Sequence, residues 1–371
     1  MKPRKAANGE AAAAPTDEPQ VQRRPQTPTP PFPYTVEEVR IEHPEAGLTL
    51  AGTLTLPAVD VARAPFPTVV LLTPAGPRDR DVTFMGHKIF AVIADHLTRN
   101  GFAVLRCDNR GVGESTGDFG TATTADFAND VRAKLRFLRG DERIDHRRTG
   151  LIGHSEGGLK AIHAAARDGE HEHRTINFIV LLGSPGVPGD DVLMLQQRRA
   201  SEAEGLDKAR IELNVRLHRR ILPLFVSELE GKELREELQK VLAEFNEQAN
   251  ESEREHLESL TEYITQLGSP WYRYFLRYDP RPDLKRIAAD VPVIAMNGML
   301  DTSVDWEQNL PEIWKALVRG GNQRITLRAL PGLNHLFQQS KTGAASEYGL
   351  LEQTFSPDAL NAITDWLQTL P

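Results

Sequence analysis

Only one cysteine, Cys107, occurs among the 371 residues of the sequence. A single thiol excludes an intramolecular disulfide, so packing of apolar side chains must hold the fold together. Cys107 ends the apolar run FAVLRC, where a buried and inert thiol is more typical than a catalytic one. No apolar run approaches the roughly 20 residues that cross a bilayer, and we therefore expect no membrane insertion.

The sequence also lacks an excess of positive charge. Lysine and arginine number 44 against 52 aspartate and glutamate residues, and the two signs are interspersed. With a formal net charge of −8 and no basic face, the chain is not expected to bind nucleic acid or an anionic membrane. A protein that acts on small molecules is therefore favoured.

Cofactor and metal motifs are missing as well. The glycine-rich stretch DNRGVGESTG (108–117) has neither the spacing of a dinucleotide fingerprint nor that of a P-loop. His171 and His173 alternate with charged residues in the polar loop GEHEHRT, a setting that does not favour a metal site. We therefore expect no cofactor and no metal.

Residues 1–33 are rich in proline, alanine, threonine and charge, and they hold too little apolar content to bury. This composition predicts a disordered N-terminal tail. The tail contains no apolar segment of the kind found in secretory signals, so a cytoplasmic protein is expected. Export stays open if a signal sequence was removed from the start of the chain.

What the sequence does contain is a regular succession of strand and helix patterns. The segments 35–43 and 48–57 alternate apolar and polar residues around PEAG, which is typical of an antiparallel hairpin. Nearly continuous apolar runs follow, as in parallel strands buried on both faces: TVVLLT (68–73), FAVLRC (102–107), TGLIG (149–153), FIVLLG (178–183) and VPVIAMNG (291–298). Helical patterns separate these runs, and RITLRAL (324–330) adds a last strand before a closing helix at 356–370. The prediction is an α/β fold with a mostly parallel, doubly wound sheet of eight strands.

Residues 188–280 interrupt this alternation. The segment is helical and highly charged, and in ELREELQKVLAEF the residues Leu234, Leu238, Val241, Leu242 and Phe245 form one apolar face. Such a face is typical of a helix packed on its own domain. Because the segment falls between two strands, we expect a helical cap at 188–280 over a core made of 34–187 and 281–371.

The motif GHSEGG places Ser155 at the centre of G-x-S-x-G, after the strand TGLIG and at the start of a helical stretch. Strand, sharp turn and helix form the context in which this motif carries a nucleophile. Side chains at Gly153 and Gly157 would crowd so tight a turn. The motif alone is only moderately specific, because a structural glycine-rich turn could look the same.

A serine nucleophile needs a base and an acid, which in this kind of fold follow in the order serine, acid, histidine. His335, in the loop LPGLNHLF after a predicted strand, is the only histidine after residue 256. Asp301, three residues after the strand VPVIAMNG ends, is the favoured acid. Asp305 is the alternative, although it also fits the first turn of the next helix.

Acyl transfer also requires N–H donors for an oxyanion. One donor is expected to be the N–H of Glu156, the residue after the nucleophile. The second should come from PAGPRDRD (74–81), where Pro74 carries no N–H. Ala75 is favoured for this role, with Gly76 as the alternative.

The carboxylate of Glu156 would oppose an oxyanion if it faced the site. We therefore expect the side chain to point away or to be held by a cation such as Arg80 or Arg110. Of these, Arg110 is interpreted mainly as a structural anchor.

The segments GHSEGG, NGMLD and PGLNH, in this order, resemble the α/β-hydrolase superfamily. Together with GPRDRD, GHKIFAVIADHLTRNGFAVLRCDNRGVGESTG and SPWYRYFLRYDP, they resemble bacterial carboxylesterases of the EstD-like group over residues 35–371. The resemblance implies a cofactor-independent serine esterase of short acyl esters with Ser155, Asp301 and His335 as its triad. Pro74 departs from the small residues or glycine that relatives carry before GP, which affects the assignment of the oxyanion donor.

Trp271 and Tyr272, in the aromatic segment after the expected cap, are candidates for the substrate pocket, with cap-to-core packing as the alternative. The predicted function is that of a serine carboxylesterase whose partner is a small-molecule ester. A serine peptidase of the same fold and a non-catalytic ligand-binding protein are the alternatives. Association into a homodimer is left open.

Overall fold

The computed structural model describes residues 23–169, 174–251, 253–254, 257 and 268–371. Its centre is an eight-stranded sheet with the order β1-β2-β6-β3-β7-β8-β9-β10. The strands are β1 (Thr35–His43), β2 (Leu48–Leu56), β3 (Phe66–Leu72), β6 (Ala103–Cys107), β7 (Ile144–His154), β8 (Ile179–Leu182), β9 (Val293–Gly298) and β10 (Ile325–Leu330). A separate two-stranded ribbon is formed by β4 (Thr83–Phe84) and β5 (His87–Lys88).

The direction of the strands follows from their apolar patterns. The alternating segments β1 and β2 pair antiparallel, and β2 pairs antiparallel with β6. From β6 to β10 every neighbouring pair is parallel. All residues of β8 and β9 are buried, as expected of strands covered on both faces. The predicted mostly parallel, doubly wound sheet is therefore confirmed.

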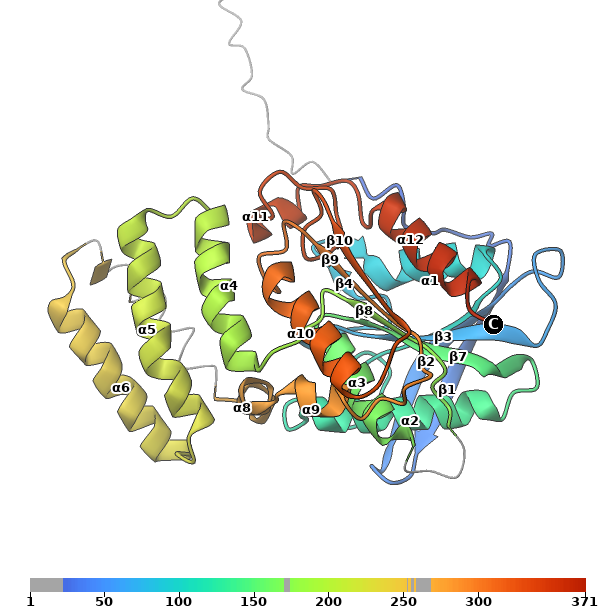
Figure 1. Ribbon diagram of the computed structural model, residues 1–371, viewed down its shortest axis with the longest axis horizontal. Coiled ribbons are helices and arrows are strands. Elements are labelled where there is room, and N and C mark those ends of the chain that lie inside the picture. Colours follow the sequence, from blue (N-terminus) through green and yellow to red (C-terminus); the bar gives the residue numbers. More distant parts are fainter. Residues whose placement is uncertain (1–22, 170–173, 252, 255–256, 258–267) are drawn as a thin grey trace, which may run out of the picture.

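Helices cover both faces of the sheet (Figure 1). Helices α1 (Ile89–Arg99) and α12 (Pro357–Gln368) pack on one face, while α2 (Thr124–Arg139), α3 (Glu156–Asp168) and α10 (Trp306–Arg319) pack on the other. A capping box between Thr123 and Asp126 begins α2 and satisfies N–H groups that the helix itself cannot. Between successive parallel strands the chain thus passes through at least one helix.

Between β8 and β9 the chain forms a group of helices that extends from the centre of Figure 1 to its left side. The group consists of α4 (Gly189–Ala203), α5 (Lys208–Val226), α6 (Gly231–Gln248), α8 (Pro270–Arg277) and the short α9 (Pro280–Leu284). Four residues of the predicted apolar face on α6 are buried in a small core with α5 and α8, and Phe245 packs against its edge. The helices α5, α6 and α8 therefore bury apolar side chains against one another, whereas Leu284 of α9 belongs to the core around the sheet. A further short helix, α11 (Ala345–Tyr348), follows β10 and lies near the site.

The expected disorder of residues 1–33 is wrong for the final third of that segment. Residues 1–22 lie outside the described part of the chain, but residues 23–33 are described and run along the folded core. The prediction considered only apolar burial, whereas polar side chains fix this segment.

Two side chains of the segment bind the backbone near the C-terminus. Arg24 donates to the carbonyl oxygens of Gly349 at 2.8 Å and Leu351 at 2.9 Å. Gln26 donates to the carbonyl oxygen of Phe355 at 2.7 Å. These contacts join residues more than 300 positions apart, so no local sequence pattern could indicate them.

Cys107 is buried at the end of β6, and burial raises the pKa of its thiol. The thiolate is therefore disfavoured, in agreement with the interpretation of an inert side chain. Within the described ranges, no helix combines the length and the apolar character needed to cross a membrane.

Candidate active site

Ser155 lies at a strained turn between a strand and a helix. β7 ends at His154 and α3 begins at Glu156, so Ser155 alone makes the turn, with φ 55° and ψ −122°. A positive φ is rare for a residue with a side chain and persists only where the surroundings enforce it. Here the close approach of Gly157 to β3 contributes, because a Cβ on Gly157 would lie 2.0 Å from the carbonyl oxygen of Leu72.

The predicted base and acid are hydrogen-bonded to each other. Nδ1 of His335 lies 2.8 Å from Oδ2 of Asp301, and both side chains are buried. Asp301 accepts further hydrogen bonds from the N–H groups of Ser303 and Val304, at 2.9 and 2.8 Å, and from Nδ2 of Asn297 at 3.2 Å. A carboxylate that accepts this many bonds is fixed in orientation, so it can hold Nδ1 as the protonated nitrogen of the imidazole.

Gly183, at the end of β8, leaves room for this pair. Its φ is +53°, and a Cβ there would lie 3.1 Å from Oδ2 of Asp301 and 3.3 Å from Nδ1 of His335. The alternative acid, Asp305, serves elsewhere, because it caps α10 by accepting from the N–H of Gln308 at 2.9 Å.

Ser155 and His335 line one cavity of about 360 Å³. Loops after β3, β7, β9 and β10 contribute to it, and so do α4 and α8 from the helical group. Most of the lining is apolar or aromatic: Pro74, Ala75, Val82, Phe84, Ile89, Pro185, Val192, Leu193, Trp271, Tyr272, Phe275, Val304, Leu336 and Tyr348. The two predicted pocket residues, Trp271 and Tyr272, are thus both part of its wall. A larger cavity of about 620 Å³ lies at α6 and α8 and includes neither Ser155 nor His335.

The two expected oxyanion donors also line this cavity. Glu156 is the first residue of α3, so its N–H has no carbonyl within the helix to bind. For the N–H of Ala75, the structure gives no acceptor among the described residues. Gly76 is not part of the wall, and its carbonyl oxygen accepts from Nδ2 of Asn109 at 3.2 Å.

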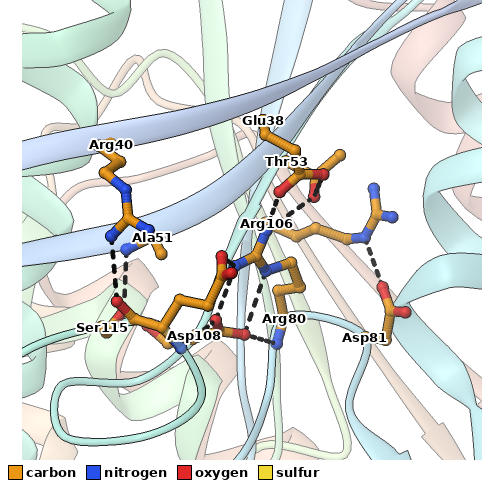
Figure 2. A network of polar contacts seen from close by, with 10 residues as sticks. Glu38, Arg40, Ala51, Thr53, Arg80, Asp81, Arg106, Asp108 and Ser115 are labelled. Carbon is orange, nitrogen blue, oxygen red and sulfur yellow. Dashed lines mark hydrogen bonds and ion pairs between the residues drawn. The ribbon is translucent and has the colours of Figure 1, made fainter.

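The loop that carries Ala75 is anchored at both ends. At its start, Nζ of Lys160 donates to the carbonyl oxygen of Thr73 at 3.0 Å, and Oγ1 of Thr73 donates to Asn109 at 2.7 Å. Near its end, Arg80 donates to Asp108 from its backbone N–H at 2.7 Å and from Nη2 at 2.8 Å (Figure 2). Asp108 and Asn109 belong to the glycine-rich stretch after β6, which therefore serves to position the loop.

The side chain of Glu156 is buried and does not stand free beside Ser155. Its Oε1 accepts from Oγ1 of Thr124 in α2 and from Nε1 of Trp271 in α8, both at 2.7 Å. Its Oε2 lies 3.3 Å from Nζ of Lys160, one turn further along α3. The carboxylate thus links α2, α3 and α8 directly behind the candidate nucleophile.

The expected cation partners of Glu156 are wrong. Arg80 is occupied by Asp108, and Arg110 donates two hydrogen bonds to Asp130 at 2.6 and 2.9 Å, which makes it the expected structural anchor. Lys160, at the i+4 position from Glu156, carries the opposing charge instead. The helical spacing within GHSEGGLK was a signal that could have indicated this pair.

His154 is a site residue that the sequence analysis missed. Its Nε2 donates to the carbonyl oxygen of His335 at 2.8 Å, and the two rings lie 5.0 Å apart between centroids. Burial, helped by the neighbouring His335, lowers the pKa of His154 to about 3. His154 is therefore neutral and fixes the loop that carries His335 to the turn that carries Ser155. Its place beside Ser155 in the motif was the available signal.

No group of three or more potential metal ligands is assembled within the described part of the chain. His171 and His173 lie outside the described residues.

A doubly wound sheet with a strained strand–turn–helix junction after a central strand defines the class of protein, and comparison with known families agrees. The chain belongs to the alpha/beta hydrolase fold family, whose model matches residues 68–338.

Sequence similarity to curated proteins covers less of the chain. Esterase EstD of Thermotoga maritima is 30% identical over 144 residues, which are 39% of this chain and 32% of that protein. An uncharacterized 31.7 kDa protein of Escherichia coli is 39% identical over 75 residues, 20% of this chain and 26% of that protein. The chain thus matches about a third or less of the length of these relatives.

Solved structures resemble this one over most of its length. The alpha/beta hydrolase GrgF from Penicillium is 18% identical with a TM-score of 0.52, covering 90% of this chain and 98% of that one. The Pyrococcus furiosus esterase Pf2001 is 15% identical with a TM-score of 0.51, covering 91% and 93%. At this level of identity, the likeness shows the fold alone.

Proposed function

We propose that this chain is a serine carboxylesterase that hydrolyses short-chain acyl esters through an acyl-enzyme intermediate. The observation that carries the proposal is that His335, paired with Asp301, lines the same cavity as Ser155, which lies at a strained turn. The partial sequence similarity to an esterase supports the same reaction. The apolar wall and modest volume of the cavity favour short acyl chains.

In the first step, Oγ of Ser155 attacks the ester carbonyl carbon while Nε2 of His335 takes the hydroxyl proton. Asp301 holds the imidazole and stabilises the imidazolium that forms. The N–H groups of Glu156 and Ala75 bind the oxyanion, and each such donor is worth about 3 kcal/mol in comparable sites. The carbon–oxygen bond to the alcohol then breaks, and His335 returns the proton to the departing alkoxide.

In the second step, water replaces the alcohol. His335 takes a proton from water while the water oxygen attacks the acyl carbon. The bond between the acyl carbon and Oγ of Ser155 then breaks, and His335 returns the proton to Oγ. The carboxylic acid leaves, and the free serine is restored. No cofactor takes part in the proposed sequence.

We further propose that residues 188–280 act as a cap over a core of 34–187 and 281–371. Val192 and Leu193 from α4, and Trp271 and Phe275 from α8, line the cavity that contains Ser155. Because the cap supplies these side chains, it is expected to set the acyl and alcohol preference.

Replacing Ser155 by alanine tests the proposed function. Hydrolysis of p-nitrophenyl acetate should fall by at least about 1,000-fold, because the covalent route is lost. A fluorophosphonate probe should label the wild type and not the variant. Ser346→Ala is the matched control, because Ser346 is an exposed residue that does not line the cavity. Equal rates for wild type and Ser155→Ala would remove Ser155 from the mechanism.

A further inference from the structure

The wall of the cavity next to Ser155 includes a cationic side chain, that of Arg78, for which the described residues provide no carboxylate partner. Two residues of its wall, apart from histidines, carry a charge, namely Arg78 and Glu156. Glu156 is paired with Lys160 and hydrogen-bonded by Trp271. Arg78 has no carboxylate within 4.0 Å among the residues that the structure describes.

The guanidinium of Arg78 is held in place without being neutralised. Its Nε donates to the carbonyl oxygen of Ala75 at 2.9 Å, and its central carbon lies 4.8 Å from the ring centroid of Phe84. The adjacent Asp79 attracts it, yet that carboxylate accepts a hydrogen bond from the N–H of Thr83 at 2.8 Å. Both Nη groups of Arg78 thus lack a protein acceptor within the described chain. A positioned guanidinium edge is a ready donor for a planar anion.

Arg80, in the same loop, differs from Arg78 in its ion pairs. Arg80 contacts the carboxylates of Glu38 and Asp108 (Figure 2). It also contacts the carboxylate of Glu114. Its pairs tie the loop to β1 and to the stretch after β6, away from the wall of the cavity. Of the two arginines in this loop, Arg80 therefore forms the ion pairs, whereas Arg78 keeps its charge on the side of the cavity.

Desolvation adds to this contrast. Arg78 is partly buried, and burial lowers the pKa of its guanidinium, although the group stays protonated at neutral pH. A cation that loses hydration without an ion pair costs stability, unless a ligand supplies the missing anion. With a net charge of −8, the whole protein offers no general attraction for anions, so the effect must be local.

We propose that Arg78 selects esters that carry a carboxylate, which the guanidinium binds through its two Nη groups while the ester carbonyl lies at Ser155. The proposal rests on the proposed esterase function and names its substrate class. Charge-assisted hydrogen bonds of this kind are roughly twice as strong as neutral ones, and two of them fix the orientation of the bound group.

The test compares esters that differ only in a terminal carboxylate. Monoethyl adipate against ethyl hexanoate places the charge on the acyl side, and 6-acetoxyhexanoate against hexyl acetate places it on the alcohol side. Product formation by the full-length wild type gives kcat/KM for each ester at neutral pH. In one of the two pairs the anionic ester should be favoured by about tenfold or more, as expected for hydrogen bonds to a charged group.

Arg78→Gln should lower kcat/KM for the favoured anionic ester about tenfold further than for its neutral counterpart, because the ion pair is lost. Arg78→Lys should keep part of the preference, since it keeps the charge but not the fork of donors. Arg319→Gln removes the same charge from the exposed end of α10 and is the matched control. It should leave the ratio of the two esters as in the wild type.

The inference would be overturned if the wild type preferred the anionic ester in neither pair. It would also be overturned if Arg78→Gln lowered kcat/KM equally for the anionic and the neutral esters. That second result would mean that Arg78 only supports Ala75. Failure of the esterase function looks different. In that case the wild type would hydrolyse none of the four esters, or Ser155→Ala would hydrolyse them as well as the wild type.

Discussion

Glu156 illustrates how single residues in this site serve more than one purpose. Its N–H is a proposed oxyanion donor, while its carboxylate accepts bonds from Thr124 and Trp271 and pairs with Lys160. Lys160 in turn holds the carbonyl oxygen of Thr73, at the start of the loop with the second proposed donor. The buried ion pair therefore supports both donors from behind, and its negative charge is compensated before an oxyanion forms.

His154 leads to a prediction about stability at acidic pH. Its pKa is lowered from about 6.5 to about 3 in the folded protein, so below pH 6.5 the unfolded chain binds a proton that the folded protein does not. Stability from this residue is complete above pH 6.5 and is lost as the pH falls toward 3. Midway between these two pKa values, the contribution of His154 should lower the free energy of unfolding by about 1.4 kcal/mol for each unit by which the pH decreases.

Urea unfolding at a series of pH values checks this expectation. His154→Gln keeps a donor for the carbonyl oxygen of His335 and removes the titrating ring, so its stability should depend less steeply on pH between 6 and about 4. His146→Gln, at an exposed position, is the control and should follow the wild type. A slope in His154→Gln as steep as that of the wild type would contradict the assigned role.

At the scale of elements, the site depends on how closely α3 approaches the sheet. A Cβ on Gly153 would lie 2.2 Å from the carbonyl oxygen of Gly157, and a Cβ on Gly157 would lie 2.0 Å from that of Leu72. Both distances are to backbone atoms, which cannot rotate away. Glycine at these positions therefore sets the spacing between the end of β3 and the start of α3, and with it the spacing of the proposed oxyanion donors.

Gly157→Ala should consequently push α3 away from β3. We expect the free energy of unfolding to fall by about 1–3 kcal/mol or more, as in other overpacked interiors. We also expect lower esterase activity. Gly169→Ala, at the other end of the same helix, is the matched control, because its φ is −73° and nothing lies within 4 Å of the added Cβ. Its stability should be unchanged or up to about 1 kcal/mol higher. Denaturant unfolding and p-nitrophenyl acetate hydrolysis measure both; equal stability of the two variants would contradict the packing argument.

At the scale of the whole molecule, the N-terminal segment at residues 23–33 is hydrogen-bonded to the C-terminal part of the fold. Arg24 contacts the carbonyl oxygens of Met85, Gly349 and Leu351. Tyr348, one position before Gly349, is part of the cavity wall. The segment at residues 23–33 therefore supports a loop that reaches the candidate site from far along the chain.

Arg24→Ala should destabilise the protein by about 1–3 kcal/mol, because the carbonyl oxygens lose hydrogen bonds from a charged group. Arg23→Ala is the control, since the Arg23 side chain is exposed and neighbours the same backbone. Thermal and urea unfolding compare the two variants. Indistinguishable stabilities would mean that the segment lies on the core without strengthening it.

The sequence by itself determined the parts that depend on local patterns. Continuous apolar runs predicted the parallel strands, because strands covered on both faces need apolar side chains throughout. The glycines around Ser155 predicted the elbow, since only glycine fits such close backbone contacts. The order of Ser155, Asp301 and His335 along the chain, with their places after strands, singled out three side chains, of which the structure pairs the last two.

The tertiary structure alone decided which distant side chains meet. Trp271 donates to Glu156 across 115 positions, and Arg24 donates to Leu351 across 327. The ring Nε2–H of His154 donates to the carbonyl oxygen of His335 across 181 positions. It also decided that Arg80 is paired with carboxylates while Arg78 has none among the described residues, although both occur in GPRDRD. Periodicity reports which face of an element is apolar, but these contacts depend on how the elements pack against one another, and that arrangement is fixed only when the whole chain is folded.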